Sequence, residues 1–174
     1  MHKGYASPEF IIKSDGKSHS IISGYASVFN TVDNHNDCIE KGAFLSSQSN
    51  HVKLLWQHDT TKPIGIIRMM DEDSYGLKVE AEINTKTKDG FDASELIKQG
   101  AVCGLSIGFN INSADYNSNG NRVIHDLNLI EISVVTFPAN EMAQINQIKQ
   151  KYVKQCKDTA VKKLAELIKQ LRKL

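Results

Sequence analysis

The chain has 174 residues, a length that fits one domain with a short appendage, and its 21 Lys and Arg against 20 Asp and Glu give a formal net charge of +1. Its three cysteines, Cys38, Cys103 and Cys156, leave an odd thiol without paired spacing, which argues against a disulfide framework and favours a reducing compartment. No apolar segment opens the sequence and no apolar run approaches about 18 residues, so we expect neither a signal peptide nor a membrane span.

The elements expected in the first 140 residues are mostly short strands separated by polar turns. Residues 42–47 suit one or two helical turns, and residues 91–99 suit a helix that ends at Gly100, because glycine accepts the left-handed conformation of a helix end. Runs of β-branched, aromatic and alternating residues predict strands over 19–30, 52–56, 63–70, 75–83, 103–111 and 122–137. Residues 1–140 are therefore predicted to form a β domain.

The hydrophobic period changes after Pro138. Asn140 is a suitable N-cap, and a first helix is expected from the spacing of Met142, Ile145, Ile148 and Tyr152. A second helix, capped at 158–159, would carry an apolar stripe of Val161, Leu164, Ile168 and Leu171. Residues 141–174 are thus predicted to form a helical tail, and a stripe this apolar must pack on the β domain or on a second copy of the chain.

The charge of the chain is divided unevenly between these two parts. Residues 141–174 carry nine Lys and Arg against three Asp and Glu, a net +6, whereas residues 1–140 carry twelve against seventeen, a net −5. The basic tail has its charges spread over a helical pattern without an aromatic stacking platform, so we do not expect it to bind nucleic acid.

The segment CGLSIGFNI (103–111) contains a candidate nucleophile. In a strand, Cys103 and the other odd-numbered apolar residues share one face, and Ser106 lies on the opposite face between Gly104 and Gly108. A face without side chains lets a peptide approach the hydroxyl, although a serine beside glycines at a bulge is equally compatible with this pattern. The letters also spell G-x-S-x-G, but the strand–serine–helix order of an α/β-hydrolase elbow is absent.

A serine needs a base, and His58 is the best candidate among six histidines. It ends the apolar strand LLWQHD, where a half-buried position fixes the ring and keeps it reachable. A structural histidine at the margin of a core is the alternative. Glu131 is the one charge in the apolar strand LNLIEISVVTF, so it requires a partner and is the preferred third member; His125, about 20 Å away on the same face, and no third member at all remain alternatives.

Five ordered segments carry a resemblance to a known family: GYASVFN, DNHNDCIEKGAF, LLWQHD with PIG, GLSIGF, and LIEISVVTFPAN. Together, over about residues 20–148, the chain closely resembles the tailed-phage prohead serine proteases, which are similar in fold and chemistry to the herpesvirus capsid maturation protease, assemblin. The resemblance implies His58 as base and Ser106 as nucleophile. It also places Glu131 where assemblins use a second histidine.

The resemblance implies an α+β, mainly β fold: a small closed antiparallel β-barrel surrounded by a few helices. It implies an endopeptidase that cleaves the capsid protein's scaffolding segment or a separate scaffold, and itself, inside the immature phage prohead in the host cytoplasm. We expect a homodimer, no cofactor and no membrane or nucleic-acid partner. A catalytically inactive scaffold or assembly module that binds capsid precursors is the alternative function.

Two departures from the family pattern concern single residues. Asn36 stands where the family usually has glycine, and asparagine tolerates the left-handed conformation that this turn needs. The adjacent arginine pair that assemblins use for the oxyanion is missing, so backbone N–H groups near Ile107–Gly108, or Arg122 or Arg68, are candidates.

Other clusters give weaker hypotheses. His51, His58 and Asp59 lack the spacing typical of a metal site, so no metal is expected. His35 and Cys38 as a thiol dyad lie in a polar turn where both suit a structural role. Cys103 is predicted to be a core residue.

Overall fold

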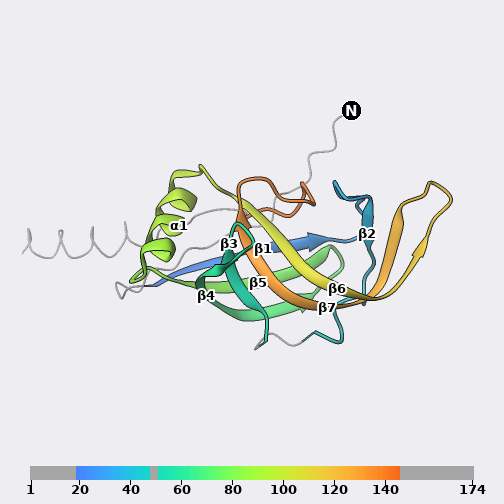
Figure 1. Cartoon of the computed structure of the whole chain (residues 1–174), viewed down its shortest axis with the longest axis horizontal. Coiled ribbons are helices and arrows are strands. Elements are labelled where there is room, and N and C mark those ends of the chain that lie inside the picture. Colours follow the sequence, from blue (N-terminus) through green and yellow to red (C-terminus); the bar gives the residue numbers. More distant parts are fainter. Residues whose placement is uncertain (1–18, 48–50, 146–174) are drawn as a thin grey trace, which may run out of the picture.

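The computed structural model describes residues 19–47 and 51–145, which form a mainly β fold with one α-helix (Figure 1). In chain order the elements are β1 His19–Val28, β2 Asp37–Ile39, β3 Lys53–Trp56, β4 Asp59–Glu72, β5 Gly76–Asn84, α1 Lys88–Gln99, β6 Gly104–Tyr116 and β7 Arg122–Val135. The predicted strands are all present, whereas residues 42–47 form hydrogen-bonded turns without a helix. In this part of the chain no helix is long and apolar enough to cross a membrane.

The strands form one curled sheet in the order β1-β5-β4-β3-β7-β2, with β6 on the other side of β7. The expected closed antiparallel barrel is wrong in two respects. First, β3 and β2 pair with β7 in parallel. Second, within the described residues β1 and β6 pair only through a short bridging segment, residues 143–145, which contacts β1 at Gly24 and β6 at Gly104. The sheet is therefore a partial barrel, which a short length of chain spans at its open seam.

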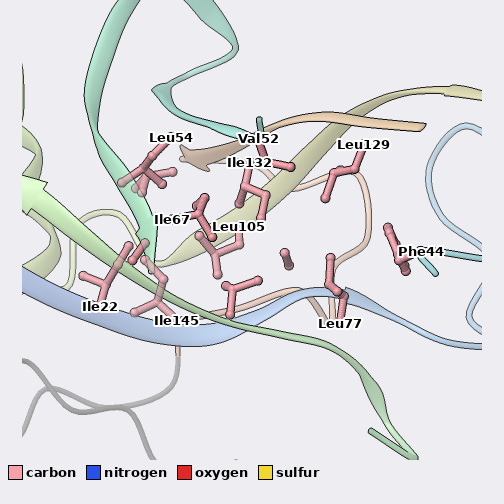
Figure 2. Packing of buried hydrophobic residues seen from close by; sticks show 14 of the residues in the cluster. Ile22, Phe44, Val52, Leu54, Ile67, Leu77, Leu105, Leu129, Ile132 and Ile145 are labelled. Atoms are coloured by element: carbon pink, nitrogen blue, oxygen red, sulfur yellow. The ribbon is translucent and has the colours of Figure 1, made fainter. Parts of the chain in front are cut away.

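The apolar core fills the inside of this curled sheet. Alternate residues of β5, from Leu77 to Ile83, are at most 1% exposed and point inward, as a strand with one buried face requires. Figure 2 shows side chains from all around the sheet meeting in the same interior, among them Ile22, Leu54, Leu105 and Ile132. Each such side chain contributes about 1.5–3 kcal/mol on burial, so the core holds the strands that carry the functional residues in fixed register.

The helix α1 lies at one end of the sheet and has well-defined caps (Figure 1). The Thr87 hydroxyl accepts a hydrogen bond from the N–H of Gly90 at 3.2 Å, so the helix begins at Lys88, three residues before the predicted start. Gly100 ends it with φ of 77°, which confirms the predicted C-cap. Buried Ala93 and Ile97 anchor the helix to the core.

The helix predicted after Asn140 is wrong for the residues that the structure describes. The Asn140 side chain does accept a hydrogen bond from the N–H of Met142, at 3.1 Å, but it caps a turn. The backbone then extends, because Leu105 donates to the carbonyl of Ala143 at 3.0 Å and the next residues bridge the two sheet edges. The rest of that helix and the apolar stripe of residues 161–171 lie outside the described residues.

Candidate active site

The pairing of β6 with β7 brings four small or polar residues together. Ser106 lies directly opposite Ser133, and Gly108 lies directly opposite Glu131. Cross-strand partners project to the same side of a sheet. The two strands therefore present one compact polar block.

A β-bulge determines which face of β7 carries Glu131. The register with β6 shifts between Glu131 and Leu129, so that Ile130 has no partner. Leu129 and Ile132 are both core residues, although they are three positions apart in one strand. Unbroken alternation over residues 127–137 would place Leu129 and Glu131 on one face; the bulge breaks it and turns Glu131 away from the core that contains Leu129.

His58 occupies the two-residue turn that joins β3 to β4. Gln57 and His58 have φ of 54° and 59°, and the flanking Trp56 and Asp59 are paired. Two left-handed residues in succession define a type I′ hairpin turn, which costs roughly 1–2 kcal/mol for each residue other than glycine. Contacts to the end of the neighbouring strand β7 must therefore hold this turn in place.

Gln57 supplies several of those contacts. Its backbone N–H donates to the carbonyl of Val134 at 3.0 Å, and its side-chain amide donates to the Thr136 hydroxyl at 2.9 Å. The backbone N–H of Thr136 donates in return to Gln57 Oε1 at 3.2 Å. The tip of the hairpin is thereby fixed to the end of β7, beside Glu131.

His58 and Glu131 form the central polar contact of the site. Nδ1 of His58 lies 2.7 Å from Oε1 of Glu131, whose other oxygen accepts a hydrogen bond from the Ser133 hydroxyl at 2.6 Å. Glu131 is 7% exposed, so its charge is buried but has partners at both oxygens. A proton on Nδ1 facing the carboxylate leaves Nε2 unprotonated and able to accept a proton from a hydroxyl.

Ser106 and His58 line the same cavity of about 700 Å³, which extends to Phe137, Asn140 and the turn around Asp37. Ser106 is 5% exposed, so its hydroxyl is not on an open surface facing solvent, although the residue lines the cavity. No hydrogen bond between Ser106 and His58 is present among the described residues. Such contacts often become short only when substrate is bound.

Gly108 matters because of its cross-strand neighbour. A β-carbon at Gly108 would lie 2.9 Å from Cγ of Glu131 and closer still to Oε1, both inside van der Waals contact. The sequence suggested that the glycine leaves room for a peptide. In the structure it leaves room for the carboxylate that faces His58.

A family model for the Caudovirus prohead serine protease matches residues 9–159. The chain belongs to this family. The resemblance seen in the five sequence segments is thereby confirmed.

Individual relatives agree with the family assignment. The prohead protease of Enterobacteria phage HK97 is 36% identical over 147 residues, which cover 81% of this chain and 65% of the relative, so the chain spans less than two thirds of that protein. The capsid polyprotein of Pseudomonas phage PAJU2 is 32% identical over 157 residues, 85% of this chain and 22% of the relative. The solved structure of the bacteriophage T4 capsid assembly protease has a similar fold, with a TM-score of 0.54 at 14% identity over 74% of this chain and 92% of that one.

Two further candidate residues lie away from the cavity that Ser106 and His58 line. Nδ1 of His125, the alternative third member, lies 2.9 Å from Glu40, and its Nε2 lies 3.3 Å from Asp115. Arg68, a candidate for the oxyanion, donates from Nε to Glu82 at 2.7 Å. Neither His125 nor Arg68 lines the cavity.

Arg122 does line the cavity, but its side chain is already engaged. Its Nε and Nη2 donate to the two oxygens of Asp37 at 2.8 and 2.7 Å, and the hydrogen bond to Asp37 raises the pKa of the guanidinium. The backbone N–H of Arg122 donates to the carbonyl of Asn36, whose φ of 63° confirms the expected left-handed turn. Arg122 therefore holds the Asp37 turn that forms the far end of the cavity.

The cysteine and metal hypotheses gain no support from the geometry. Burial, followed by the charges of Glu40 and Asp33, raises the pKa of the Cys38 thiol, which disfavours the reactive thiolate. Cys103 is exposed and not in the core, because β6 begins only at Gly104. Over residues 19–47 and 51–145 no three His, Cys, Asp or Glu side chains are arranged to hold a metal ion.

Sequence reasoning missed Ser133, Gln57 and Thr136. Ser133 had a detectable signal, since it lies two positions after the lone charge of an apolar strand, where both side chains share a face. Gln57 and Thr136 had none, because their contact depends on how the hairpin meets the end of β7.

Proposed function

We propose that this chain is a serine endopeptidase in which Ser106 is the nucleophile, His58 the general base and Glu131 the group that orients His58. The observation that carries the proposal is the 2.7 Å contact from His58 Nδ1 to Glu131 Oε1 in a cavity that also contains Ser106. A buried carboxylate on one ring nitrogen leaves the other free to act on a hydroxyl. Membership of the prohead serine protease family supports the same assignment.

The reaction proceeds through an acyl-enzyme. The Ser106 oxygen attacks the peptide carbonyl carbon while its proton passes to His58 Nε2. The carbon–nitrogen bond then breaks and His58 returns the proton to the leaving amine. Water, deprotonated by His58, hydrolyses the ester and restores the serine. Backbone N–H groups near Ile107–Gly108, or the remaining donors of Arg122, stabilise the oxyanion.

The proposed substrate is the scaffolding segment of the capsid protein or a separate scaffold, together with the protease itself. Two comparisons support this choice: a relative named a capsid polyprotein and a neighbour in fold named a capsid assembly protease. The proposed site of action is the interior of the immature prohead in the host cytoplasm. We further propose a homodimer, with residues 141–174 as the contact between subunits.

Replacement of Ser106 tests the proposal directly. The Ser106→Ala variant is co-expressed with the capsid precursor, and cleavage is followed on a gel, alongside labelling of the full chain with a fluorophosphonate. Cleavage and labelling should both be lost while the far-UV circular dichroism spectrum is unchanged. Ser113→Ala, an exposed serine of the same strand, is the control and should behave like the unmodified chain. Normal precursor cleavage by Ser106→Ala would show that the nucleophile is misassigned.

A further inference from the structure

The hydroxyl of Ser133 lies at the centre of the site and is 0% exposed. It is directly across the strand pair from Ser106, in the cross-strand position on β7. It donates to Oε2 of Glu131 at 2.6 Å and accepts from the backbone N–H of His58 at 3.0 Å. One buried hydroxyl thus contacts both residues of the proposed base system.

These contacts close a ring of hydrogen bonds. The ring runs from the His58 N–H to Ser133 Oγ, on to Glu131 Oε2, across the carboxylate to Oε1, and back to His58 through Nδ1. His58 is therefore held at two points, its main chain and its imidazole. Glu131 is held at both oxygens, so that Oε1 faces the imidazole of His58.

Glu131 and His58 each depend on the hydrogen bond to Ser133 for a different reason. The glutamate side chain has three rotatable bonds, and a carboxylate with one oxygen unpaired in a buried site would turn toward another donor. His58 lies in a strained left-handed turn, which persists only when surrounding contacts determine it. Loss of the Ser133 hydroxyl removes one contact from each side of the pair at once.

We propose that Ser133 is a positioning residue: it sets the orientation of Glu131 and the location of His58, and thereby the readiness of His58 to take the Ser106 proton. Ser133 does not react itself, because its fully buried hydroxyl is out of reach of a peptide. This inference rests on the proposed function, since a positioning residue presupposes the base that it positions.

The test separates the hydroxyl from the volume of the side chain. Ser133→Thr keeps a hydroxyl, Ser133→Val has the shape of threonine without it, and Ser133→Ala is smaller and also lacks it. The readout is the rate of fluorophosphonate labelling of Ser106 in the full chain. A hydrogen bond to a charged group is worth enough to change this rate roughly 10- to 100-fold, so valine and alanine should both be slowed by that factor, with threonine within about threefold of serine. The proposal is overturned if the labelling rates follow the volume of the side chain at position 133, or if all variants are labelled at equal rates.

Ser20 provides a matched control. It is a strand serine that is 2% exposed, and its hydroxyl lies 2.8 Å from that of Ser94, away from the cavity. Ser20→Val should lower the melting temperature as Ser133→Val does but leave the labelling rate within about twofold. An equal loss of rate in both variants would mean that buried hydroxyls act only through stability, against the proposal.

A spectroscopic signature supplements the rates. In the NMR spectrum of the chain with isotope-labelled histidine, the proton shared by His58 Nδ1 and Glu131 should give a low-field signal that is kept in Ser133→Thr and shifted or lost in Ser133→Ala.

Ser106→Ala and Glu131→Gln are treated with the fluorophosphonate in parallel with the Ser133 variants. If these two react normally, the proposed function fails; if they fail to react while Ser133→Ala reacts at the full rate, only the positioning role fails.

Discussion

Replacing Glu131 with glutamine should reduce activity by between about 10²-fold and 10⁴-fold, the upper figure being the loss when the equivalent acid is neutralised in a well-studied serine protease. The surroundings of Glu131 favour the larger effect. The Ser133 hydroxyl donates to one carboxylate oxygen of Glu131 and accepts from the His58 N–H. Because its proton needs an acceptor, it favours the oxygen of a glutamine amide over the NH₂ group at this position. In Glu131→Gln the amide oxygen then faces Ser133 and the amide NH₂ faces His58 Nδ1. That arrangement forces the proton onto Nε2, where it blocks the uptake of the Ser106 proton.

The assay is the second-order rate of fluorophosphonate labelling, with processing of the co-expressed capsid precursor as the second measure. Glu40→Gln is the matched control, because Glu40 lies 2.9 Å from Nδ1 of His125 in a similar pair outside the cavity. That control should keep its rate within about twofold. A folded Glu131→Gln variant that is labelled at more than a third of the normal rate would refute the reasoning. If His125→Ala then showed the large loss of labelling rate instead, His125 would be the group that orients His58.

Three further predictions concern Gly108, Tyr25 and the C-terminal residues. Gly108→Ala should slow labelling roughly 10- to 100-fold with a folded spectrum, because the new methyl group displaces the Glu131 carboxylate, and an unchanged rate would contradict that crowding. Burial, followed by the contact with Asp73, raises the pKa of Tyr25 to about 12, whereas an unfolded tyrosine ionises near 10, so the fold should lose stability as the pH rises from about 10 to 12. Tyr25→Phe should flatten that part of the melting-temperature profile, and identical profiles would exclude this contribution. Truncation after Ile148 should shift the protein toward monomer in sedimentation and lower its specific activity; a fully active dimer would assign the tail to capsid or scaffold binding.

The strands and α1 were predictable because their signals are local. The alternation within β5 and the glycine that ends α1 at Gly100 need only a few neighbouring residues. Closure of the sheet was not predictable in this way. The spacing of Met142 and Ile145 fits a helix as well as it fits an extended bridge, and the unpaired edges of β1 and β6 decided the outcome.

The choice of candidate site residues rested on their chemistry and on the family resemblance, whereas their arrangement could not be predicted. A single charge in an apolar strand needs a partner, which singled out Glu131 before any contact was known. The bulge at Ile130 leaves no mark in the sequence, so counting places Glu131 on the same face as Leu129, whereas the structure turns it away from the core that contains Leu129. The turn at His58 was equally hidden, because Gln and His are unusual choices for two successive left-handed positions.

The bridging segment at residues 143–145 has a consequence for synthesis of the chain. During translation β1 and β6 leave the ribosome long before the segment that lies between them, and the cavity wall at Pro138 and Asn140 also emerges late. Until then two strand edges remain open, and open edges are sites of mispairing between nascent chains. The described fold and its cavity are therefore completed at nearly the same stage of synthesis, so a partly made chain lacks one wall of the cavity that Ser106 and His58 line.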